Sequence, residues 1–545
     1  GADALDRLRG MFAFAIHDNE SGGLFLARDR LGIKPLFYHW DGRTLVAASE
    51  IKALFASGLV EPRLDPHSIR NYFRYQFQVS PYTPFAGVYE LPPGHCLSIG
   101  RGGRPRIRQY WDLEFPRDGD YDDLDEQRWL QRFEQALDEA AANHTIGDVP
   151  IGAYLSGGVD SAAMTYFLSR HYPRPPDTFS IHFTNPGMDE SPEYKRIAEH
   201  LGTANTELTM VDDRPEGFMD ELRRCLYHLE QPQRLAVDIP HLGLSGLVRG
   251  RGYKVVYTGD GADEILGGYD CFRQDAMREW GNEQPNFAAR RRLYLNEFTQ
   301  YFAPAHMRLL LRQHRRKEQR RTIRRFGCYP AWYDFWHIMD EPSSGLFTDE
   351  FEAANRDNRQ MRDLARRMKP RLEGRHPLNQ SLYIETKTRL PGWILWKSDR
   401  LSMANSVEAR VPFMDHPLVE LAAHMPPALK LNGMDEKYAL KAVARPHLPP
   451  QQNEYKKRGF YTPIREWFFA DHHWESTRPY LDRAALEETG LFRPEAVEAM
   501  ATELRQAAPG QDMDAQYRVM QLEWTLMTVL SVQVLHRLFV SKEAP

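Results

Sequence analysis

Cysteine is scarce in this chain of 545 residues. Only four are present, Cys96, Cys225, Cys271 and Cys328, and no two of them form a Cys-x-x-Cys pair. This usage argues against a disulfide framework and against a structural zinc site. It predicts a reducing compartment, and therefore a cytoplasmic protein.

Long apolar runs and an excess of positive charge are also lacking. No uninterrupted apolar stretch reaches the roughly 18 residues of a membrane span. The most apolar stretch, residues 524–540, is interrupted by Gln533, His536 and Arg537, which predicts a buried helix. The chain has 70 Lys and Arg against 75 Asp and Glu, a net charge of −5. We therefore expect neither a membrane nor a nucleic-acid partner. The opening residues do not have the pattern of a signal peptide, so we expect none.

The composition is that of a globular protein with several domains. Hydrophobic residues make up 42% and charged residues 27%, and the length suggests two to four domains. Residues 1–115 contain short apolar runs separated by turn formers such as Asp41-Gly42, a pattern typical of β-hairpins. Residues 116–125 are acidic and rich in turn formers, which predicts a linker.

Residues 126–545 have a different pattern. Glu126–His144 shows helical periodicity, and strand-like segments then alternate with helical ones. This order predicts a doubly wound, mostly parallel α/β sheet, followed from about residue 270 by a mainly helical part. Strands are predicted at 149–155, 178–183, 206–211 and 254–258, and helices at 160–169 and 191–201.

The string Ser156-Gly157-Gly158-Val159-Asp160-Ser161 follows the first of these strands and opens a helix. Glycines let a ligand approach the backbone, and the start of a helix offers free N–H groups to an anion. An acid within such a loop fits a divalent cation that bridges phosphates. The alternative is a plain glycine-rich turn. No Gly-Lys-Ser/Thr follows, so the string is not a Walker A loop.

A second acidic string, Thr258-Gly259-Asp260-Gly261-Ala262-Asp263-Glu264, follows another predicted strand. Parallel strands end at one shared edge of a sheet, where ligands bind. Asp160 and the group of Asp260, Asp263 and Glu264 are therefore expected to converge, with a metal held between phosphates and Asp160 plus Asp263. The alternative is an acidic surface turn.

At this point the chain resembles a known family. Ser-Gly-Gly-x-Asp-Ser is the pyrophosphate loop (PP-loop) of ATP pyrophosphatases. The other strings resemble class II glutamine amidotransferases of the bacterial, B-type asparagine synthetase family, and together they span essentially the whole chain. They are Leu8-Arg-Gly-Met-Phe-Ala-Phe-Ala, Leu26-Ala-Arg-Asp-Arg-Leu-Gly-Ile-Lys-Pro-Leu-Phe-Tyr, Leu91-Pro-Pro-Gly-His, Lys397-Ser-Asp-Arg-Leu-Ser-Met-Ala, Val407-Glu-Ala-Arg-Val-Pro-Phe-Met-Asp and Lys457-Arg-Gly-Phe-Tyr-Thr-Pro.

The resemblance implies a fold and a set of roles. It implies an Ntn-hydrolase αββα sandwich at residues 1–115 and a PP-loop ATP pyrophosphatase domain at 126–545. Asp260 is implied in acyl-adenylate formation or proton transfer, and Lys457 in neutralising the transferred phosphoryl group. Asp399 and Arg410 are implied in the acceptor pocket, with a structural ion pair as the alternative. The implied nucleotide and pyrophosphate contacts are Leu155, Ser156, Gly157, Gly158, Ser161, Ile181, Thr258 and Gly259, and the implied Mg²⁺ ligands are Asp160 and Asp263.

Two features depart from the family pattern. The family's nucleophile is a cysteine at the mature N-terminus, whereas this sequence opens at Gly1 and Cys96 reads as a core residue. We expect either a fragment whose N-terminal glutaminase segment is a separate piece, or a form that uses free ammonia or another amine. Residues 230–237 carry Arg234 and Leu235 where relatives have small and acidic residues, which argues against aspartate as the acceptor.

The predicted activity is that of a ligase. ATP and a small-molecule carboxylate, by default aspartate, would give an acyl-adenylate and pyrophosphate, and ammonia, from glutamine in the family, would then form the amide. The alternatives are a tailoring amidotransferase or cyclase on another carboxylate, and a non-catalytic nucleotide-binding subunit. A homodimer is left open. Residues 308–325 hold nine Lys and Arg against one Glu, read as a solvated helical face, with a contact to nucleic acid, a carrier protein or an anionic substrate tail as alternatives.

Overall fold

Two antiparallel sheets form the N-terminal part of the chain. The computed structural model describes residues 2–211, 217–273, 275, 320–330, 332–333, 339–454, 462–507 and 513–543. One sheet has the order β1-β2-β6-β7 and the other β4-β3-β5. Their strands are β1 (Ala13–His17), β2 (Leu24–Arg28), β3 (Phe37–Trp40), β4 (Leu45–Ala48), β5 (Val88–Glu90), β6 (His95–Ile99) and β7 (Arg106–Gln109).

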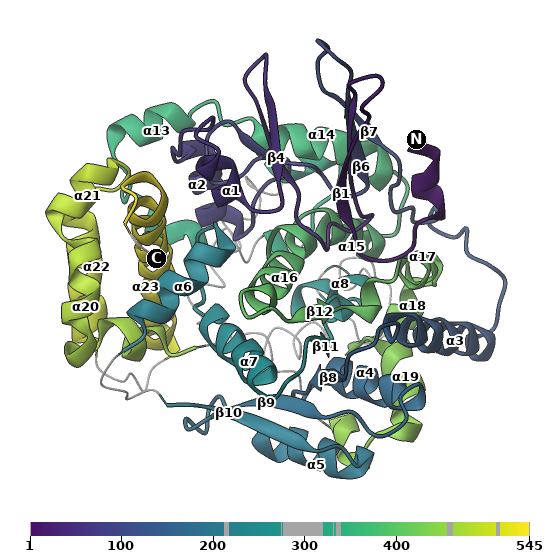
Figure 1. The fold of residues 1–545 in the computed structure, drawn as a ribbon. Helices are drawn as coiled ribbons and strands as arrows, with labels where there is room; N and C mark the ends of the chain where they lie inside the picture. The colour runs from purple at the N-terminus through teal and green to yellow at the C-terminus, as the bar shows by residue number, and fades with distance from the viewer. Residues whose placement is uncertain are drawn as a thin grey trace.

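One apolar cluster joins these two sheets. Leu26 and Leu97 of the first sheet are fully buried, and they share this cluster with buried Tyr38 of the second. This layer confirms the predicted sandwich. Helices α1 (Ile51–Ala56) and α2 (Pro66–Tyr75) connect β4 to β5 of the second sheet and lie between this sheet and the C-terminal helices (Figure 1).

The central sheet is parallel and doubly wound, as predicted. Its order is β10-β9-β8-β11-β12, and every neighbouring pair is parallel. The strands are β8 (Ile151–Tyr154), β9 (Thr178–Phe183), β10 (Asn205–Met210), β11 (Val255–Tyr257) and β12 (Glu408–Arg410). The chain runs outward from β8 to β10 and then returns to β11 on the other side of β8. The strand order therefore reverses between β8 and β11, which is where such sheets bind ligands.

Helices cover both faces of this sheet (Figure 1). Leu168 of α4 (Val159–Arg170) packs against Val255, whereas Leu244 of α7 (Asp238–Gly250) packs against Val256 on the opposite face. This alternation is what a strand buried on two sides requires. The predicted helix Glu126–His144 is present as α3, and its N-cap Asp125 accepts a hydrogen bond from the Arg128 amide at 2.8 Å.

The rest of the described chain is mainly helical, as predicted. These helices are α5 (Ser191–Leu201), α6 (Met219–Leu229), α8 (Ala262–Leu266), α13 (Asp349–Asn355), α14 (Gln360–Leu372), α15 (Pro377–Lys387), α16 (Leu395–Met403), α17 (His416–His424), α18 (Pro427–Lys430), α19 (Tyr438–Ala444), α20 (Asp471–Leu481), α21 (Arg483–Thr489), α22 (Pro494–Gln506) and α23 (Met513–Leu535), with a short hairpin of β13 (Leu431–Asn432) and β14 (Asp435–Glu436). The apolar stretch at 524–540 is the buried second half of α23 and the π-helical turn His536–Val540. Among the described helices, none has both the length and the apolar character that crossing a bilayer needs.

Several side chains connect the N-terminal part to the rest. Lys34 Nζ lies 2.6 Å from Asp399 Oδ1. The carboxylate of buried Glu230 accepts the amides of Ile51 and Lys52 at the start of α1, and it pairs with Arg400 of α16 at 2.6 Å. Cys96 is buried, as predicted for a core residue, and all four cysteines are free thiols.

Candidate active site

The loop at residues 156–158 lies between β8 and α4, at the edge where the strand order reverses. The Ser156 amide donates to Ser161 Oγ at 3.0 Å, and the Gly158 amide donates to Ser156 Oγ at 3.2 Å. Gly158 is the N-cap of α4 and supplies no capping side chain. The amides of the first helical turn therefore face the edge of the sheet without a side-chain cap, as an anion site requires.

A carboxylate already lies against this loop. The Gly157 amide donates to Glu190 Oε2 at 3.1 Å. Glu190 immediately precedes α5, 33 residues further along the chain. An acidic oxygen thus occupies a position at which the loop would present its N–H to a phosphate.

The second acidic loop follows β11 and abuts the start of α4. A Cβ on Gly259 would lie 2.9 Å from the Ser161 backbone nitrogen and 3.0 Å from Asp160 Cβ, so only glycine fits between the two loops. Asp260 Oδ2 accepts hydrogen bonds from Thr258 Oγ1 at 3.0 Å and from Ser398 Oγ at 2.6 Å. The two motifs that sequence placed at one edge therefore do meet there.

Asp160 and Asp263 converge on one cation, the ammonium of Lys437. Lys437 Nζ lies 2.7 Å from both carboxylate oxygens of Asp160 and 3.1 Å from Asp263 Oδ1. The Lys437 side chain is 3% exposed. Burial by itself lowers the pKa of Lys437, but the two carboxylates outweigh it and raise that pKa above its ordinary value. The amine is therefore held in its charged form.

The same two carboxylates fit a magnesium ion. Mg²⁺ is commonly held by one or two carboxylates together with water and substrate phosphates. Within the described ranges, no three His, Cys, Asp or Glu side chains come together to form a complete metal site. Asp160 and Asp263 would thus bind the ion together with phosphates rather than enclose it.

The remaining candidate nucleotide contacts lie along this edge. Leu155 directly follows β8 and is buried, with its carbonyl accepting from Ser180 Oγ at 2.7 Å. Ile181 lies half-buried on the neighbouring strand β9. Thr258 is buried, and its amide donates to the Arg410 carbonyl at 2.9 Å.

Comparisons with known proteins identify the family. The asparagine synthase family model matches residues 132–537, and a glutamine amidotransferase domain model matches residues 1–111. This chain belongs to the asparagine synthase family. It is 30% identical to the amidase chyE of Penicillium rubens, over 86% of this chain and 71% of the relative. It is 28% identical to the amidase chry2 of Gibberella zeae, over 90% and 78%. It is also 28% identical to a glutamine-hydrolysing asparagine synthetase of Bacillus subtilis, over 85% and 70%.

Family membership makes the chain a ligase of the amidotransferase type, in a family that uses ATP, typically with Mg²⁺. Its N-terminal sheets form the glutamine amidotransferase domain, and the doubly wound sheet forms the synthetase part. The domain boundaries at 115 and 125 stay predictions. Residues 118–125 contain no helix or strand.

Asp399 and Arg410, the two predicted acceptor residues, each have partners within the protein. Asp399 pairs with Lys34. The Arg410 guanidinium donates to the carbonyls of His144 and Ile146 at the C-terminal end of α3, and it pairs with Glu408 at 2.7 Å. These contacts fit the alternative of a structural role for each, with separate partners rather than with each other. The acceptor role of Asp399 and Arg410 stays a prediction.

Two other candidates fall wholly or partly outside the described residues. Lys457 lies outside them, so its predicted role stays a prediction. Of the basic run 308–325, only residues 320–325 are described. Arg320, Arg321 and Arg324 are exposed there, as on a solvated helical face, and Arg325 lies 3.3 Å from the Tyr333 hydroxyl.

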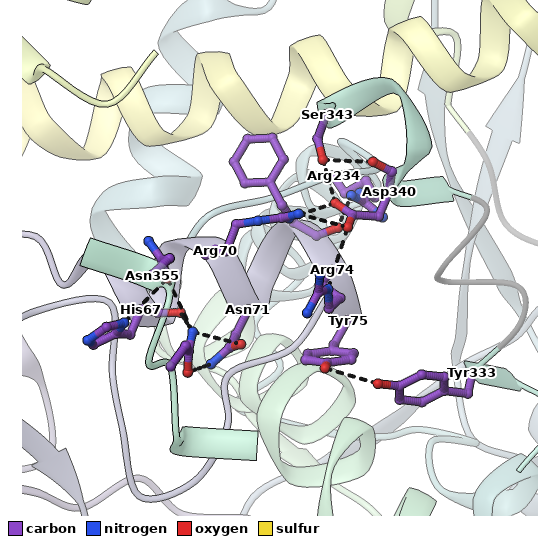
Figure 2. Close-up of polar contacts among 12 residues, drawn as sticks. His67, Arg70, Asn71, Arg74, Tyr75, Arg234, Tyr333, Asp340, Ser343 and Asn355 are labelled. Carbon is purple, nitrogen blue, oxygen red and sulfur yellow. Dashed lines mark hydrogen bonds and ion pairs between the residues drawn. The ribbon is translucent and has the colours of Figure 1, made fainter. Parts of the chain in front are cut away.

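The divergent segment 230–237 is buried, and its Arg234 lies against α2 (Figure 2). Arg234 is 1% exposed and donates through Nη2 to the Phe73 carbonyl, whereas its Nε and Nη1 have no partner among the described residues. Figure 2 shows it beside Asp340, whose carboxylate is bound by Arg70 at 2.8 and 3.1 Å. Burial lowers the pKa of Arg234 to about 10.

Sequence reasoning missed Lys437, Glu190 and Ser398. Lys437 lies in no recognised string and is 277 residues from Asp160. Of the three, only Glu190 has a sequence feature that could have drawn attention to it, because it is an acid that directly precedes a predicted helix. Ser398 lay in a quoted motif, but sequence attached no role to it.

Proposed function

We propose that this chain is an AMP-forming amide ligase. A carboxylate oxygen of the acceptor attacks the α-phosphorus of ATP, and pyrophosphate leaves. Ammonia then attacks the acyl carbon of the adenylate, the C–O bond breaks, AMP departs and one ammonia proton is lost to a base. The observation that supports this most strongly is the convergence of Asp160 and Asp263 beside an uncapped glycine loop at the switch point of the sheet.

Each group of site residues has its own role in the proposed reaction. Amides of the 156–158 loop and the first turn of α4 would bind the pyrophosphate oxygens, and Leu155 and Ile181 would contact the nucleotide. Asp160 and Asp263 would hold Mg²⁺, which when bound offsets phosphate charge. Thr258 and Ser398 fix the orientation of Asp260, the proposed proton acceptor. Lys457 remains the proposed group for charge on the transferred phosphoryl.

The acceptor is aspartate in the first candidate and a different carboxylate in the second. Arg234 favours the second, because a buried guanidinium with two unsatisfied nitrogens is costly unless something else fills their hydrogen bonds. Two of the relatives compared above are named amidases, which also fits a broader acceptor range. A cytoplasmic location and a homodimer stay predictions.

Pyrophosphate release tests this proposal. The purified chain receives MgATP, ammonium and either aspartate or a panel of other carboxylic acids. Release with aspartate, accompanied by asparagine, supports the first candidate, and release with another acid supports the second. ATP binding without release under every condition would point to a non-catalytic nucleotide-binding subunit. Asp160→Asn must abolish release, since full activity in that variant would remove the metal assignment.

Arg234→Met tests whether Arg234 binds the acceptor. If Arg234 binds the acceptor, the variant raises KM for that acid about tenfold or more while Tm stays level or rises, because an unsatisfied buried cation has been removed. An unchanged KM for the active acid would contradict a role in acceptor binding.

A further inference from the structure

Both charges that a metal–triphosphate complex would bring to this site are present within the protein itself. The ammonium of Lys437 lies between the proposed metal ligands Asp160 and Asp263. The carboxylate of Glu190 accepts the amide of Gly157 in the proposed phosphate loop. The proposed metal position is thus occupied by an ammonium, and the proposed phosphate position by a carboxylate.

The backbone around Lys437 positions its ammonium between the two aspartates. Lys437 follows the β13–β14 hairpin directly and adopts a left-handed backbone, φ 53°, at the N-cap of α19. Gly268 leaves the room that the arrangement needs. A Cβ at Gly268 would lie 1.9 Å from Asp263 Oδ1 and 2.9 Å from Lys437 Cδ. The hairpin, the helix start and the glycine together hold the ammonium against both carboxylates.

An ammonium and a metal ion cannot both occupy this position. Lys437 Nζ is within 3.1 Å of both carboxylates, so an ion bound directly by the pair must displace it. The cost of displacement is high while Lys437 has no other anion to contact, because a buried ammonium without a partner is strongly destabilising. A triphosphate would supply that anion.

We propose that Lys437 competes with the divalent cation for Asp160 and Asp263, so that the cation binds tightly only together with the triphosphate. This inference rests on the proposed function, which makes those two aspartates the metal ligands. The coupling is reciprocal, so the cation must also strengthen nucleotide binding. The consequence is a site that stays closed to free divalent cations and opens to the metal–nucleotide complex.

Manganese binding measured by electron paramagnetic resonance tests the inference. The full chain is titrated with Mn²⁺ alone and with Mn²⁺ plus α,β-methylene-ATP, whose α–β linkage cannot be cleaved. Lys437→Met should bind Mn²⁺ alone about tenfold or more tightly than wild type, within the roughly 5- to 150-fold range of ordinary coupling. The analogue should raise Mn²⁺ affinity strongly in wild type and much less in the variant.

Lys441→Met is the matched control. Lys441 lies one turn further along α19 and pairs with Asp435 at 2.6 Å and Glu436 at 3.0 Å, away from the two aspartates. The Lys441→Met variant should therefore bind Mn²⁺ with the same affinity as wild type. Equal Mn²⁺ affinity of wild type and Lys437→Met without nucleotide would overturn the competition.

Two further outcomes are decisive. If Lys437→Met is unstable, added Mn²⁺ should restore its Tm, because the ion replaces the lost charge; failure of Mn²⁺ to restore folding would contradict the inference. If wild type with the analogue binds no Mn²⁺, or if Asp160→Asn binds it equally well, the metal assignment of the proposed function fails instead. The two failures are therefore distinguishable.

Discussion

Adding one methyl group at Gly259 should separate the two loops that form the site. The backbone φ of Gly259 is not in the left-handed region, so alanine is conformationally allowed there and the effect is purely steric. The new Cβ would lie 2.9 Å from the Ser161 backbone nitrogen and 3.0 Å from Asp160 C and Cβ. These are mainly backbone contacts at the start of a helix, so no flexible side chain can relieve them by rotating.

The size of the effect follows from the distances. Ordinary contacts begin at 3.4 Å, so the loops must move apart by roughly 0.5 Å. Overpacking of this kind costs about 1–3 kcal/mol in stability. A displacement of ~1 Å at a reacting centre costs about 10²-fold in rate, so a loss of roughly tenfold or more in pyrophosphate release is expected.

Gly250→Ala is the matched control for Gly259→Ala. Gly250 is the exposed last residue of α7, and a Cβ there meets nothing within 4 Å. The assay is steady-state pyrophosphate release together with Tm for both variants. Gly250→Ala should keep wild-type turnover and Tm, or gain slightly in Tm from helix propensity. If Gly259→Ala had the same turnover and the same Tm as Gly250→Ala, the inferred close approach of the two loops would be refuted.

Two further predictions concern buried charges outside the loops. Burial raises the pKa of Asp238 to about 6, well above its unfolded value, so its contribution to stability is present below about pH 4 and is lost as the pH rises through 6. The free energy of unfolding of Asp238→Asn, relative to that of wild type, should therefore rise by about 3 kcal/mol between pH 4 and pH 7 when both are measured by urea denaturation. A difference that does not change with pH would refute the raised pKa of Asp238. Asp399→Asn should lose about 1–3 kcal/mol of stability through its broken pair with Lys34 yet keep KM for the acceptor within about twofold. The double variant with Lys34→Met should be no worse than either single one, and a large rise in KM would return Asp399 to the acceptor pocket.

The sequence predicted those parts of the fold that depend on local pattern. The strand at 178–183 and the helices at 126–144 and 191–201 match the observed bounds, because period and turn residues agree within each segment. The strand β12, Glu408–Arg410, was missed because three residues carry no period. Its position beside β11 depends on a partner about 150 residues earlier in the chain.

The site was predictable where two motifs each follow a strand of one sheet. The rule that parallel strands end at a shared edge is enough to bring Asp160 and Asp263 together. The position of Lys437 depends on how α19 packs onto that edge, which no local pattern encodes. The direction of the Arg410 side chain could not be predicted from the sequence either. Its backbone carbonyl accepts the Thr258 amide, whereas its guanidinium caps the C-terminal end of α3.

The phosphorus products of the reaction show directly whether the chain forms an adenylate. Phosphorus NMR of the reaction with MgATP, ammonium and the active acceptor distinguishes AMP plus pyrophosphate from ADP plus phosphate. We expect AMP and pyrophosphate in equal amounts from wild type, and neither product from Asp160→Asn or Asp263→Asn. Release of ADP and phosphate, or unchanged AMP formation by either variant, would contradict it.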